Sequence, residues 1–595
     1  MPSNMNYFMK TAQHFFTTLS ERAYWGLLLG TVFFYHVLIG FQGLEMTDEG
    51  WLLTGYQQIF SHPESVESMF YTYNTLLLGG LWNLIFGWMG IIGFRILAAL
   101  VLTSIAAVVY GICRNRINRW IVFFSLLAVM IGRTYLMVLH YNYTSALVVL
   151  LIILLIQKAI EKDSLMLFCA AGIVTGIGVF FRFPNLSFVG MILVLVLHYI
   201  YNKDIRRTFS FLGMAIGGFI IGIGLNITIL YALGHQEPMQ NMLTIVSALS
   251  TAEDSSHSLP HLLQTYFNQY REIFCLMGQM ALIIFALWLT NRYEKIRWLR
   301  LAIIAGILLL SAAYLLIWYK INFTLGYLYI FGSFALSYLI FFLFFVRREL
   351  FDQQMAYLVL FAVLILLLMP LGSDVGIHNV GAFCLYLPIP VAIGVLDKYF
   401  ATNRPDAQKR FRCYAFLIGC CFMAASMASM SRNCYRDKGC SRLQMNERLA
   451  YSVVASTYTS ADKVQKVDAV LQALQPLLAE GTELLSYPSA PMLNYLTNTK
   501  PYLNGAWIGI MNYSVYAAEF KKAEETKDLP IIVLIKSPEV EWYKSNPEWH
   551  GVLDCGDWHP AIEEKNALLA DFMANYEYLV YYDDPLFQVN VPKLY

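Results

Sequence analysis

Long apolar runs are the feature of this sequence that most constrains its fold. A helix needs roughly 20 apolar residues to cross the hydrocarbon core of a membrane. Runs of this kind recur from residue 22 to residue 431 of the 595-residue chain, and we count thirteen. They cover residues 22–43, 94–113, 120–138, 144–160, 164–181, 185–202, 209–233, 273–290, 301–319, 325–346, 355–371, 381–397 and 413–431. The sequence therefore predicts a mainly α, polytopic helical membrane domain over residues 1–431.

The composition supports this class. Charged residues make up 14% of the chain, whereas soluble proteins average about 25%, which excludes an ordinary cytosolic globular protein. The 41 Lys and Arg residues are balanced by 40 Asp and Glu residues, so the charge gives no indication of a nucleic-acid partner, and we expect none. Ten cysteines are too few for a disulfide-stabilised scaffold.

The character of the chain changes after Ser431. Residues 432–595 carry 15 Lys and Arg residues against 21 Asp and Glu residues. Helical and strand patterns alternate there, which is typical of a small parallel or mixed sheet with helices. The expected helices are 461–474, 514–525 and 561–576, and the expected strands are 483–487, 531–536 and 578–582. This α/β domain holds no nucleotide-binding or hydrolase motif, so a lid, docking or acceptor-holding role is favoured over catalysis.

Basic residues predict the orientation. With a cytoplasmic N-terminus, 21 of the 26 Lys and Arg residues of the membrane domain fall at cytoplasmic ends of spans. Thirteen crossings then place the C-terminal domain outside, which in a bacterial inner membrane is the periplasm. The first span is expected to remain as an anchor. Two long outer loops result, at 44–93 and 234–272, and residues 76–88 of the first are expected to form a helix lying on the membrane surface.

Three carboxylates follow the first span directly. Glu45, Asp48 and Glu49 are spaced so that one helical turn would present all three on one face. Their mutual repulsion would raise the pKa of at least one of them. A general base, or a divalent cation such as Mg or Mn held by Asp48 and Glu49, could use this arrangement. The alternative is that acidic residues simply decorate an outer loop.

Basic residues at the predicted outer ends of the spans are few. Arg182, Lys320 and Arg95 are candidates for binding an anionic group, because a charge near the hydrocarbon costs a few kcal/mol or more unless it is paired or hydrated. For Arg95 and Lys320, snorkelling to lipid head groups explains the position equally well. Arg182 is followed by Pro184, which ends the helix there, and binding of an anionic group is the favoured interpretation.

Several polar segments at the same predicted face add candidate substrate-binding residues, although plain turns also explain them. These residues are Tyr141, Asn142, Asn185, Ser373, Asp374, His378 and Asn379. Elsewhere, Cys434 and Cys440 could form a local disulfide on the oxidising side. The pairs Gly172/Gly176, Gly213/Gly217 and Gly218/Gly222 have the spacing of helix–helix contacts in membranes.

This layout resembles the GT-C superfamily of integral-membrane glycosyltransferases. The shared features are the acidic motif after span one, the surface helix before span two, a long later outer loop, thirteen spans and an extracytoplasmic tail. Short motifs are similar to those of dolichyl-phosphate-mannose transferase-like or Rgt-like bacterial multi-pass proteins. They are Thr47-Asp-Glu-Gly50, Arg182-Phe-Pro-Asn185, Gly372-Ser-Asp-Val-Gly376 and Tyr435-Arg-Asp437. The tail lacks the W-W-D-type signature of oligosaccharyltransferases, which argues against transfer of a whole glycan.

The resemblance implies a sugar donor carried on a polyprenyl phosphate and used at the outer face of the membrane. The acceptor would be a hydroxyl of a glycan, lipid or protein, and in-line attack would invert the anomeric configuration. Asp48, or failing it Glu49, would take the proton of the acceptor hydroxyl. Arg182, with Lys320 and Arg95, would bind the donor phosphate, and Glu45 would join the substrate-binding set. A divalent cation is optional in the superfamily.

Two other functions fit part of this pattern. A transporter or flippase for a lipid-linked or anionic substrate would also need many spans and a polar cavity. However, the sequence has neither an internal repeat nor paired ionisable residues at mid-membrane. A non-catalytic assembly factor whose outer domain binds a partner is the third alternative.

Overall fold

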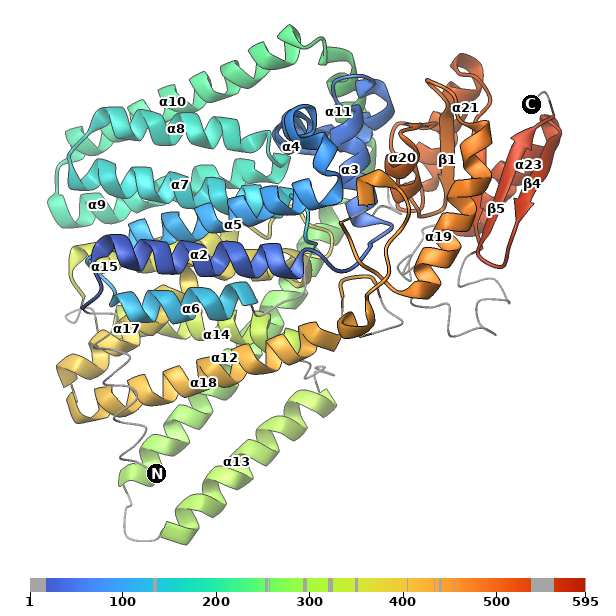
Figure 1. The fold of residues 1–595 in the computed structure, drawn as a ribbon. Helices are drawn as coiled ribbons and strands as arrows, with labels where there is room; N and C mark the ends of the chain where they lie inside the picture. Colours follow the sequence, from blue (N-terminus) through green and yellow to red (C-terminus); the bar gives the residue numbers. More distant parts are fainter. Residues whose placement is uncertain are drawn as a thin grey trace.

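A computed structural model describes most of the chain. It covers residues 18–131, 136–251, 255, 257–292, 297–318, 325–347, 351–403, 405–432, 434–437, 441–454, 456–536 and 561–593. A bundle of long helices forms the membrane domain, and a small α/β domain lies at one end of the bundle, at the right in Figure 1. The chain is therefore a multi-pass membrane protein with a C-terminal α/β domain, which confirms the predicted fold class.

The helices of the membrane domain follow one another with short connections. They are α2 (Glu21–Ile39), α3 (Asp48–Gln58), η1 (Pro63–Thr72), α4 (Tyr73–Phe86), α5 (Ile91–Cys113), α6 (Arg119–Ile131), α7 (Tyr141–Glu161), α8 (Leu165–Val179), η3 (Phe183–Leu193), α9 (Val194–Asn202), α10 (Ile205–Ala232), α11 (Gln236–Thr251), α12 (Leu259–Arg292), α13 (Arg297–Trp318), α14 (Leu325–Val346), α15 (Gln353–Leu368), α16 (Ile377–Val380), η5 (Gly381–Tyr386), α17 (Pro388–Asn403) and α18 (Pro405–Arg432). Side-chain caps begin several of them, for example Ser20 for α2 and Asp204 for α10, because such a side chain satisfies a free backbone N–H.

All thirteen predicted runs contain helix in the described part of the chain. Among the residues that the structure describes, seven helices are long and apolar enough to cross a membrane, or eight if the bent pair Ile377–Tyr386 and Pro388–Thr402 is one span. Helices α6, α8 and α15 have 13, 15 and 16 residues. At 1.5 Å per residue they reach about 20–24 Å, short of a hydrocarbon core of about 30 Å. Polar side chains fill the first half of α12, and they lower its hydropathy. This search covers only the residues that the structure describes, so the total of thirteen spans stays a prediction.

Glycines bring α8 and α10 into close contact. A Cβ atom on Gly172 would lie 2.1 Å from the carbonyl oxygen of Ala215, and one on Gly218 would lie 2.0 Å from that of Cys169. Gly176 and Gly222 meet the partner backbone in the same way. Two of the three predicted glycine pairs therefore form a helix–helix contact. The third pair, Gly213/Gly217, has nothing within 4 Å of the added atoms, so its prediction as a contact is wrong within this chain.

Both predicted outer loops fold at the end of the bundle next to the C-terminal domain. Asn241 of α11 donates a hydrogen bond to Glu67 of η1 at 2.9 Å, and the hydroxyl of Tyr73 lies 3.0 Å from His235. Helix α4 is seen nearly end on in Figure 1, across the direction of the spans. Its Leu84 and the following Trp88 are 67% and 80% exposed, as expected for a helix that lies in the membrane surface.

The C-terminal domain contains a five-stranded mixed sheet in the order β2-β1-β3-β5-β4. Its strands are β1 (Glu483–Tyr487), β2 (Lys500–Pro501), β3 (Ile531–Ile535), β4 (Tyr578–Asp583) and β5 (Phe587–Pro592), and its helices are α19 (Ala461–Leu474), α20 (Met492–Thr497), α21 (Tyr513–Thr526) and α23 (Ile562–Asn575). Strand β1 pairs in parallel with β2 and β3, whereas β5 is antiparallel to β3 and β4. The three strands and three helices expected from the sequence are present. The elements that the sequence missed are the short β2 and α20 and the last strand, β5.

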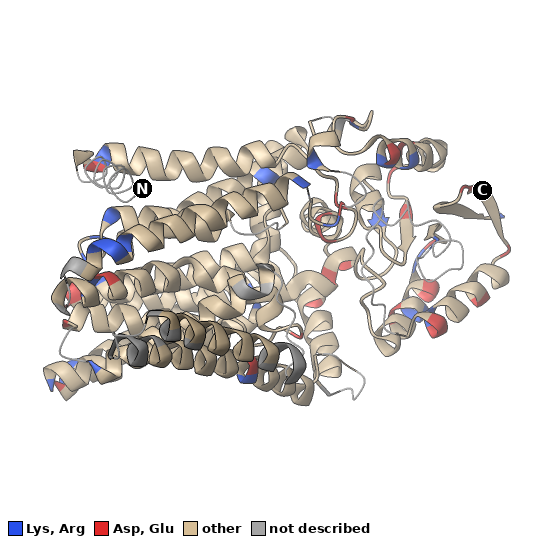
Figure 2. Cartoon of the chain, turned by 90° about the horizontal axis from the view of Figure 1, so that it is seen from below, with Lys and Arg blue, Asp and Glu red and all other residues tan. Residues whose placement is uncertain are grey.

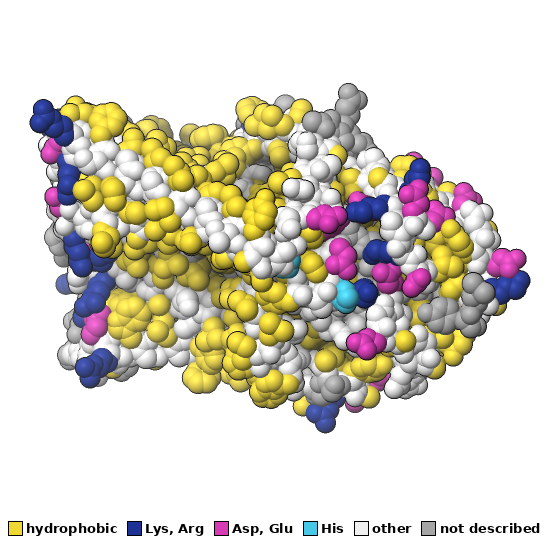
Figure 3. All heavy atoms as spheres, turned by 90° about the horizontal axis from the view of Figure 1, so that it is seen from above, with side chains coloured by type: hydrophobic (Ala, Val, Ile, Leu, Met, Phe, Trp, Pro, Cys, Tyr) yellow, Lys and Arg dark blue, Asp and Glu magenta, His cyan; other side chains and the backbone are white. Residues whose placement is uncertain are grey.

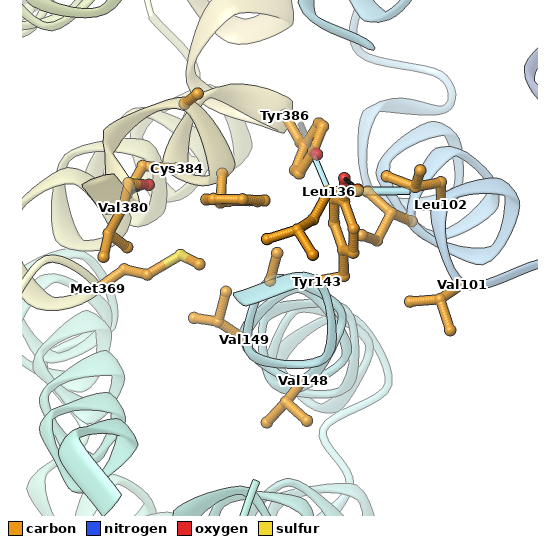
Figure 4. Packing of buried hydrophobic residues seen from close by; sticks show 14 of the residues in the cluster. Val101, Leu102, Leu136, Tyr143, Val148, Val149, Met369, Val380, Cys384 and Tyr386 are labelled. Atoms are coloured by element: carbon orange, nitrogen blue, oxygen red, sulfur yellow. Dashed lines mark hydrogen bonds between the residues drawn. The ribbon is translucent and has the colours of Figure 1, made fainter. Parts of the chain in front are cut away.

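A continuous apolar core joins the spans. Figure 4 shows α5, α7 and the η5 region packed together, with Tyr143 and Tyr386 side by side. The hydroxyl of Tyr143 donates to the carbonyl oxygen of Leu136 at 2.9 Å, so this buried phenol keeps a partner.

Charge is concentrated at the two ends of the bundle. Apolar side chains cover its flank in Figure 3, and Figure 2 shows basic residues at the end away from the C-terminal domain. The basic residues at that end include Arg114 and Arg116 on the α5–α6 connection, Lys158 in the last turn of α7, and Arg206 and Arg207 in the first turn of α10. This is the end predicted to face the cytoplasm; the orientation itself stays a prediction.

Candidate active site at the junction with the C-terminal domain

The three acidic residues of the first loop do not share one role. The Glu45 carboxylate accepts hydrogen bonds from the backbone N–H of Thr47 at 2.8 Å and from that of Glu49. It therefore caps the N-terminus of α3 from inside the protein, with its side chain 3% exposed. Burial and the neighbouring charge of Asp48 raise the pKa of Glu45 to about 7. The sequence predicted that the three carboxylates would raise the pKa of at least one of them, and the carboxylate whose pKa is raised is Glu45.

Glu49 forms a buried ion pair with Arg95. Its Oε2 atom lies 2.6 Å from Arg95 Nη2, and both side chains are 2% exposed. Arg95 also donates to the carbonyl oxygens of Gly40 and Gly43 at 2.6 and 2.7 Å. These contacts tie the end of α2 to the start of α5. They direct Arg95 toward the loop and not toward a donor phosphate, and they give Glu49 a structural contact in place of a free carboxylate.

Asp48 lies at the junction of the two domains. The hydroxyl of Tyr435 donates to its Oδ2 atom at 2.8 Å, and Arg436 Nη1 lies 3.1 Å from the same atom. The Asp48 side chain is 17% exposed, so it is the most accessible of the three carboxylates that follow the first span. Arg436 also stands over the ring of Trp507 at 5.5 Å. A hydroxyl donor and a cation thus orient one carboxylate oxygen of Asp48.

A second buried ion pair holds the connector that carries Tyr435 and Arg436. Lys463 Nζ lies 2.6 Å from Asp437 Oδ1, with the two side chains 0% and 1% exposed. The other Asp437 oxygen accepts from the backbone N–H of Leu44 and from the hydroxyl of Thr459, each at 2.7 Å. The first loop is therefore fixed to the C-terminal domain immediately before Glu45.

Arg182 is buried near Tyr141. Its side chain is 4% exposed, and Nη1 donates to the carbonyl oxygen of Met369 at 3.2 Å. Tyr141, Tyr71 and Asp374 lie within electrostatic range of the guanidinium. Tyr141 is also within electrostatic range of Asp48. The structure thus brings the predicted residues Asp48, Tyr141, Arg182 and Asp374 together at one end of the bundle.

An aromatic series links this group to the C-terminal domain. The ring of Tyr71 lies 6.0 Å from that of Tyr141 and 6.5 Å from that of Trp51, which is 6.3 Å from Trp507. Beside Tyr141, burial and the charge of Arg182 lower the pKa of His140 to about 3. His140 is therefore neutral, and its Nδ1 atom accepts from the backbone N–H of Asn142.

The segment 370–379 lies against the motif that contains Arg182. Gly372, with φ +76°, faces Pro184 so closely that a Cβ atom would lie 2.5 Å from the proline ring. Ser373 is buried and accepts from the N–H of Gly376, while Gln269 accepts from the N–H of Ile377 at 2.6 Å. Glycine is needed here because only it adopts this backbone beside a proline ring. The two predicted motifs are therefore neighbours.

The remaining predicted residues have different environments. Asn185 donates to Ser145 at 2.9 Å and to the carbonyl oxygen of Gly178 at 3.0 Å, and so fastens η3 to α7 and α8. Asn142 is fully buried, and neither atom of its carboxamide has a hydrogen-bond partner. His378 is exposed with its ring 4.6 Å from that of Phe331, and Asn379 follows it in α16.

Two predicted residues lie outside the described part of the chain. They are Lys320 and Cys440, so the donor-phosphate role of the first and the disulfide of the second stay predictions. Cys434, the expected partner of Cys440, is buried against Arg442, whose Nη2 lies 3.3 Å from the sulfur.

The first loop does not offer a set of metal ligands. Within the described ranges, no group of three His, Cys, Asp or Glu side chains is placed to hold a metal ion. Glu45 is engaged by backbone N–H groups, Glu49 by Arg95, and Asp48 by Tyr435 and Arg436. A divalent cation at Asp48 and Glu49 would have to displace these donors, so the residues as arranged do not fit it.

Four residues of the site were not singled out from the sequence as site residues. Tyr435 and Arg436 belong to the Tyr435-Arg-Asp437 motif, whose short polar pattern after the last span was the available signal. No sequence pattern marks Tyr71 or Trp507, because isolated aromatic residues are common in membrane proteins. Only the tertiary structure brings these two residues close to the site.

The fold and site define a multi-pass membrane protein with a carboxylate and a buried cation under an α/β domain. No protein-family model and no curated protein matches the sequence. Among solved structures, the chain is similar to ArnT from Cupriavidus metallidurans bound to undecaprenyl phosphate, with a TM-score of 0.42 and 14% identity over 95% of this chain and 97% of that one. The apo state of the same protein gives a TM-score of 0.40 and 14% identity over 96% and 98%. At this level the likeness says nothing about substrates.

Proposed function

We propose that this chain is a membrane glycosyltransferase that moves a sugar from a polyprenyl-phosphate donor to an acceptor hydroxyl at the outer face of the membrane. The observation that carries the proposal is that Asp48 and Arg182 both lie within electrostatic range of Tyr141. Transfer from a lipid phosphate needs a base for the acceptor and a cation for the leaving group, and these two side chains supply both.

In this mechanism the acceptor oxygen attacks the anomeric carbon of the donor sugar. The new glycosidic C–O bond forms as the bond between that carbon and the phosphate oxygen breaks. The proton of the hydroxyl passes to Asp48, which Tyr435 and Arg436 hold in place. The electron pair leaves with the polyprenyl phosphate, which is stable as an anion and needs no strong acid. Attack from the face opposite the phosphate inverts the configuration.

Arg182 is suited to the donor phosphate because it is buried and a backbone carbonyl is its one hydrogen-bond partner among the described residues. A cation in a dry site stabilises developing negative charge more strongly than one in water. Apolar side chains on η3, which begins directly after Arg182, face the membrane: Leu186 and Leu193 are 55% and 50% exposed. A lipid tail could lie along them while its phosphate meets Arg182.

The test is transfer by purified protein in nanodiscs, with labelled polyprenyl-phosphate sugars and crude envelope acceptors. Asp48→Asn should lower the rate at least about 100-fold, the usual contribution of a general base, while donor binding persists. Arg182→Gln should weaken donor binding. Asp462→Asn, an exposed carboxylate in the first turn of α19, is the matched control. Folded wild-type protein that transfers no sugar from any donor would contradict the proposal and favour a carrier.

A further inference from the structure

A polar cavity lies between the two domains, beside the candidate active site. It has a volume of about 350 Å³, and its walls come from η1, from the start of α11 and from the α21 side of the C-terminal domain. Cavities of this size accommodate small ligands. In Figure 3, acidic and basic side chains gather around the junction of the bundle and the C-terminal domain. The site residues described above do not line this cavity.

One wall of the cavity holds a buried amide without partners. Asn504 is 3% exposed, and neither its side-chain nitrogen nor its oxygen has a hydrogen bond within the part of the chain that the structure describes. Buried polar groups are almost always hydrogen-bonded, so an unpaired buried amide at a cavity indicates a ligand or water. The backbone there is fixed, because the N–H of Ser68 donates to the carbonyl oxygen of Asn504 at 3.0 Å.

The charge of the lining is negative. Four carboxylates, Glu64, Glu67, Glu237 and Glu519, line the cavity with two lysines, Lys522 and Lys527. Each lysine already faces a carboxylate: Lys522 Nζ lies 3.6 Å from Glu67 and Lys527 Nζ lies 3.6 Å from Glu483. The lining therefore accepts hydrogen bonds from hydroxyl groups and repels a phosphate.

Burial also affects the protonation of this lining. It raises the pKa of Glu67 and that of Glu519 above the ordinary value for a glutamate.

Both walls are close in sequence to residues of the candidate active site. Glu67 precedes Tyr71 by four residues in the same 3-10 helix, and Asn504 precedes Trp507 by three residues. At about 2 Å rise per residue in a 3-10 helix, Glu67 lies roughly one turn from Tyr71. A molecule in the cavity could therefore present a hydroxyl group to the aromatic series beside Asp48.

We propose that this cavity is the acceptor subsite and that it takes a neutral glycan in preference to a phosphorylated one. The role of the cavity as an acceptor site rests on the proposed function, whereas its preference for a neutral sugar rests on the residues of the lining alone. Asn504 would pair its carboxamide with a sugar hydroxyl, and Glu519 would accept from a second hydroxyl.

The test measures sugar binding to the full-length protein in nanodiscs by saturation-transfer NMR, without any donor. The probes are N,N′-diacetylchitobiose, glucose and glucose 1-phosphate. We expect Asn504→Ala and Glu519→Gln each to weaken chitobiose binding about five- to tenfold, the value of one hydrogen bond. Glu525→Gln, an exposed carboxylate on the same helix α21, is the matched control and should bind like wild type. Glucose should bind more tightly than glucose 1-phosphate.

The outcomes separate the two proposals. No binding by the wild type in the millimolar range, unchanged binding by both variants, or tighter binding of glucose 1-phosphate would overturn the subsite. A protein that binds chitobiose through Asn504 but transfers no sugar would retain the neutral-sugar site and contradict the glycosyltransferase. A protein that transfers sugar with an acceptor KM unaffected by either variant would retain the enzyme and overturn the subsite.

Discussion

The buried pair Glu49–Arg95 allows a quantitative test of what the first acidic motif does. The two charges are 2.6 Å apart with both side chains 2% exposed. With an effective dielectric constant of about 20, their attraction is roughly 6 kcal/mol. Desolvation offsets much of it, so the informative quantity is the cost of removing one partner, which is about 3–5 kcal/mol for a buried pair.

Glu49→Gln should therefore lower the free energy of unfolding by about 3–5 kcal/mol, because the Arg95 charge stays buried without a counter-ion. Arg95→Met should cost at least as much, since it also leaves the carbonyl oxygens of Gly40 and Gly43 unpaired. The double variant should cost less than the sum of the two, with a coupling energy of about 2 kcal/mol or more.

The assay is unfolding of the four proteins in mixed detergent micelles, together with the transfer rate per folded molecule. If Glu49 holds the loop, the rate per folded molecule of Glu49→Gln should stay within about tenfold of wild type, far from the loss expected for Asp48→Asn. Additive stability losses, or a Glu49→Gln protein that is stable but inactive, would refute the structural role and make Glu49 the base.

Three further outcomes can be checked with the same protein. Gly172→Val should destabilise the fold strongly, since a Cβ there would lie 2.1 Å from a backbone oxygen of Ala215, whereas Gly213→Val, with open space around it, should not; equal melting temperatures would contradict this packing. The folded-state pKa of Glu45, about 7 against a model-compound value of 4.5, means that its stabilising contribution is full below pH 4.5 and is lost as the pH rises to about 7. The loss should be about 3 kcal/mol, and Glu45→Gln should flatten it in melts recorded against pH. Transfer should persist in excess chelator, because the carboxylates of the first loop already have protein partners; an activity that disappears and returns with added Mg or Mn would disprove it.

The sequence by itself determined the class of fold and most of its elements. Apolar runs locate helices because burial in lipid or protein acts on each segment separately, and alternating patterns locate β1 and α19 at Glu483–Tyr487 and Ala461–Leu474 for the same reason. Asp48 and Arg182 could also be predicted, because charges are costly near a membrane and stand out against their neighbours. The total of thirteen spans stays a prediction, since hydropathy does not report whether a helix is long enough to cross.

Only the tertiary structure decided which charge has which role. Glu45, Asp48 and Glu49 are equivalent in a sequence pattern, yet one caps a helix, one faces Tyr435 from 387 residues away, and one pairs with Arg95 from 46 residues away. The cavity lined by Asn504 is also a product of chain segments that are distant in sequence. Local periodicity predicts which side of a helix or strand is buried. The partner of a buried charge depends instead on how the elements pack together, and these partners determine which residues of the site can react.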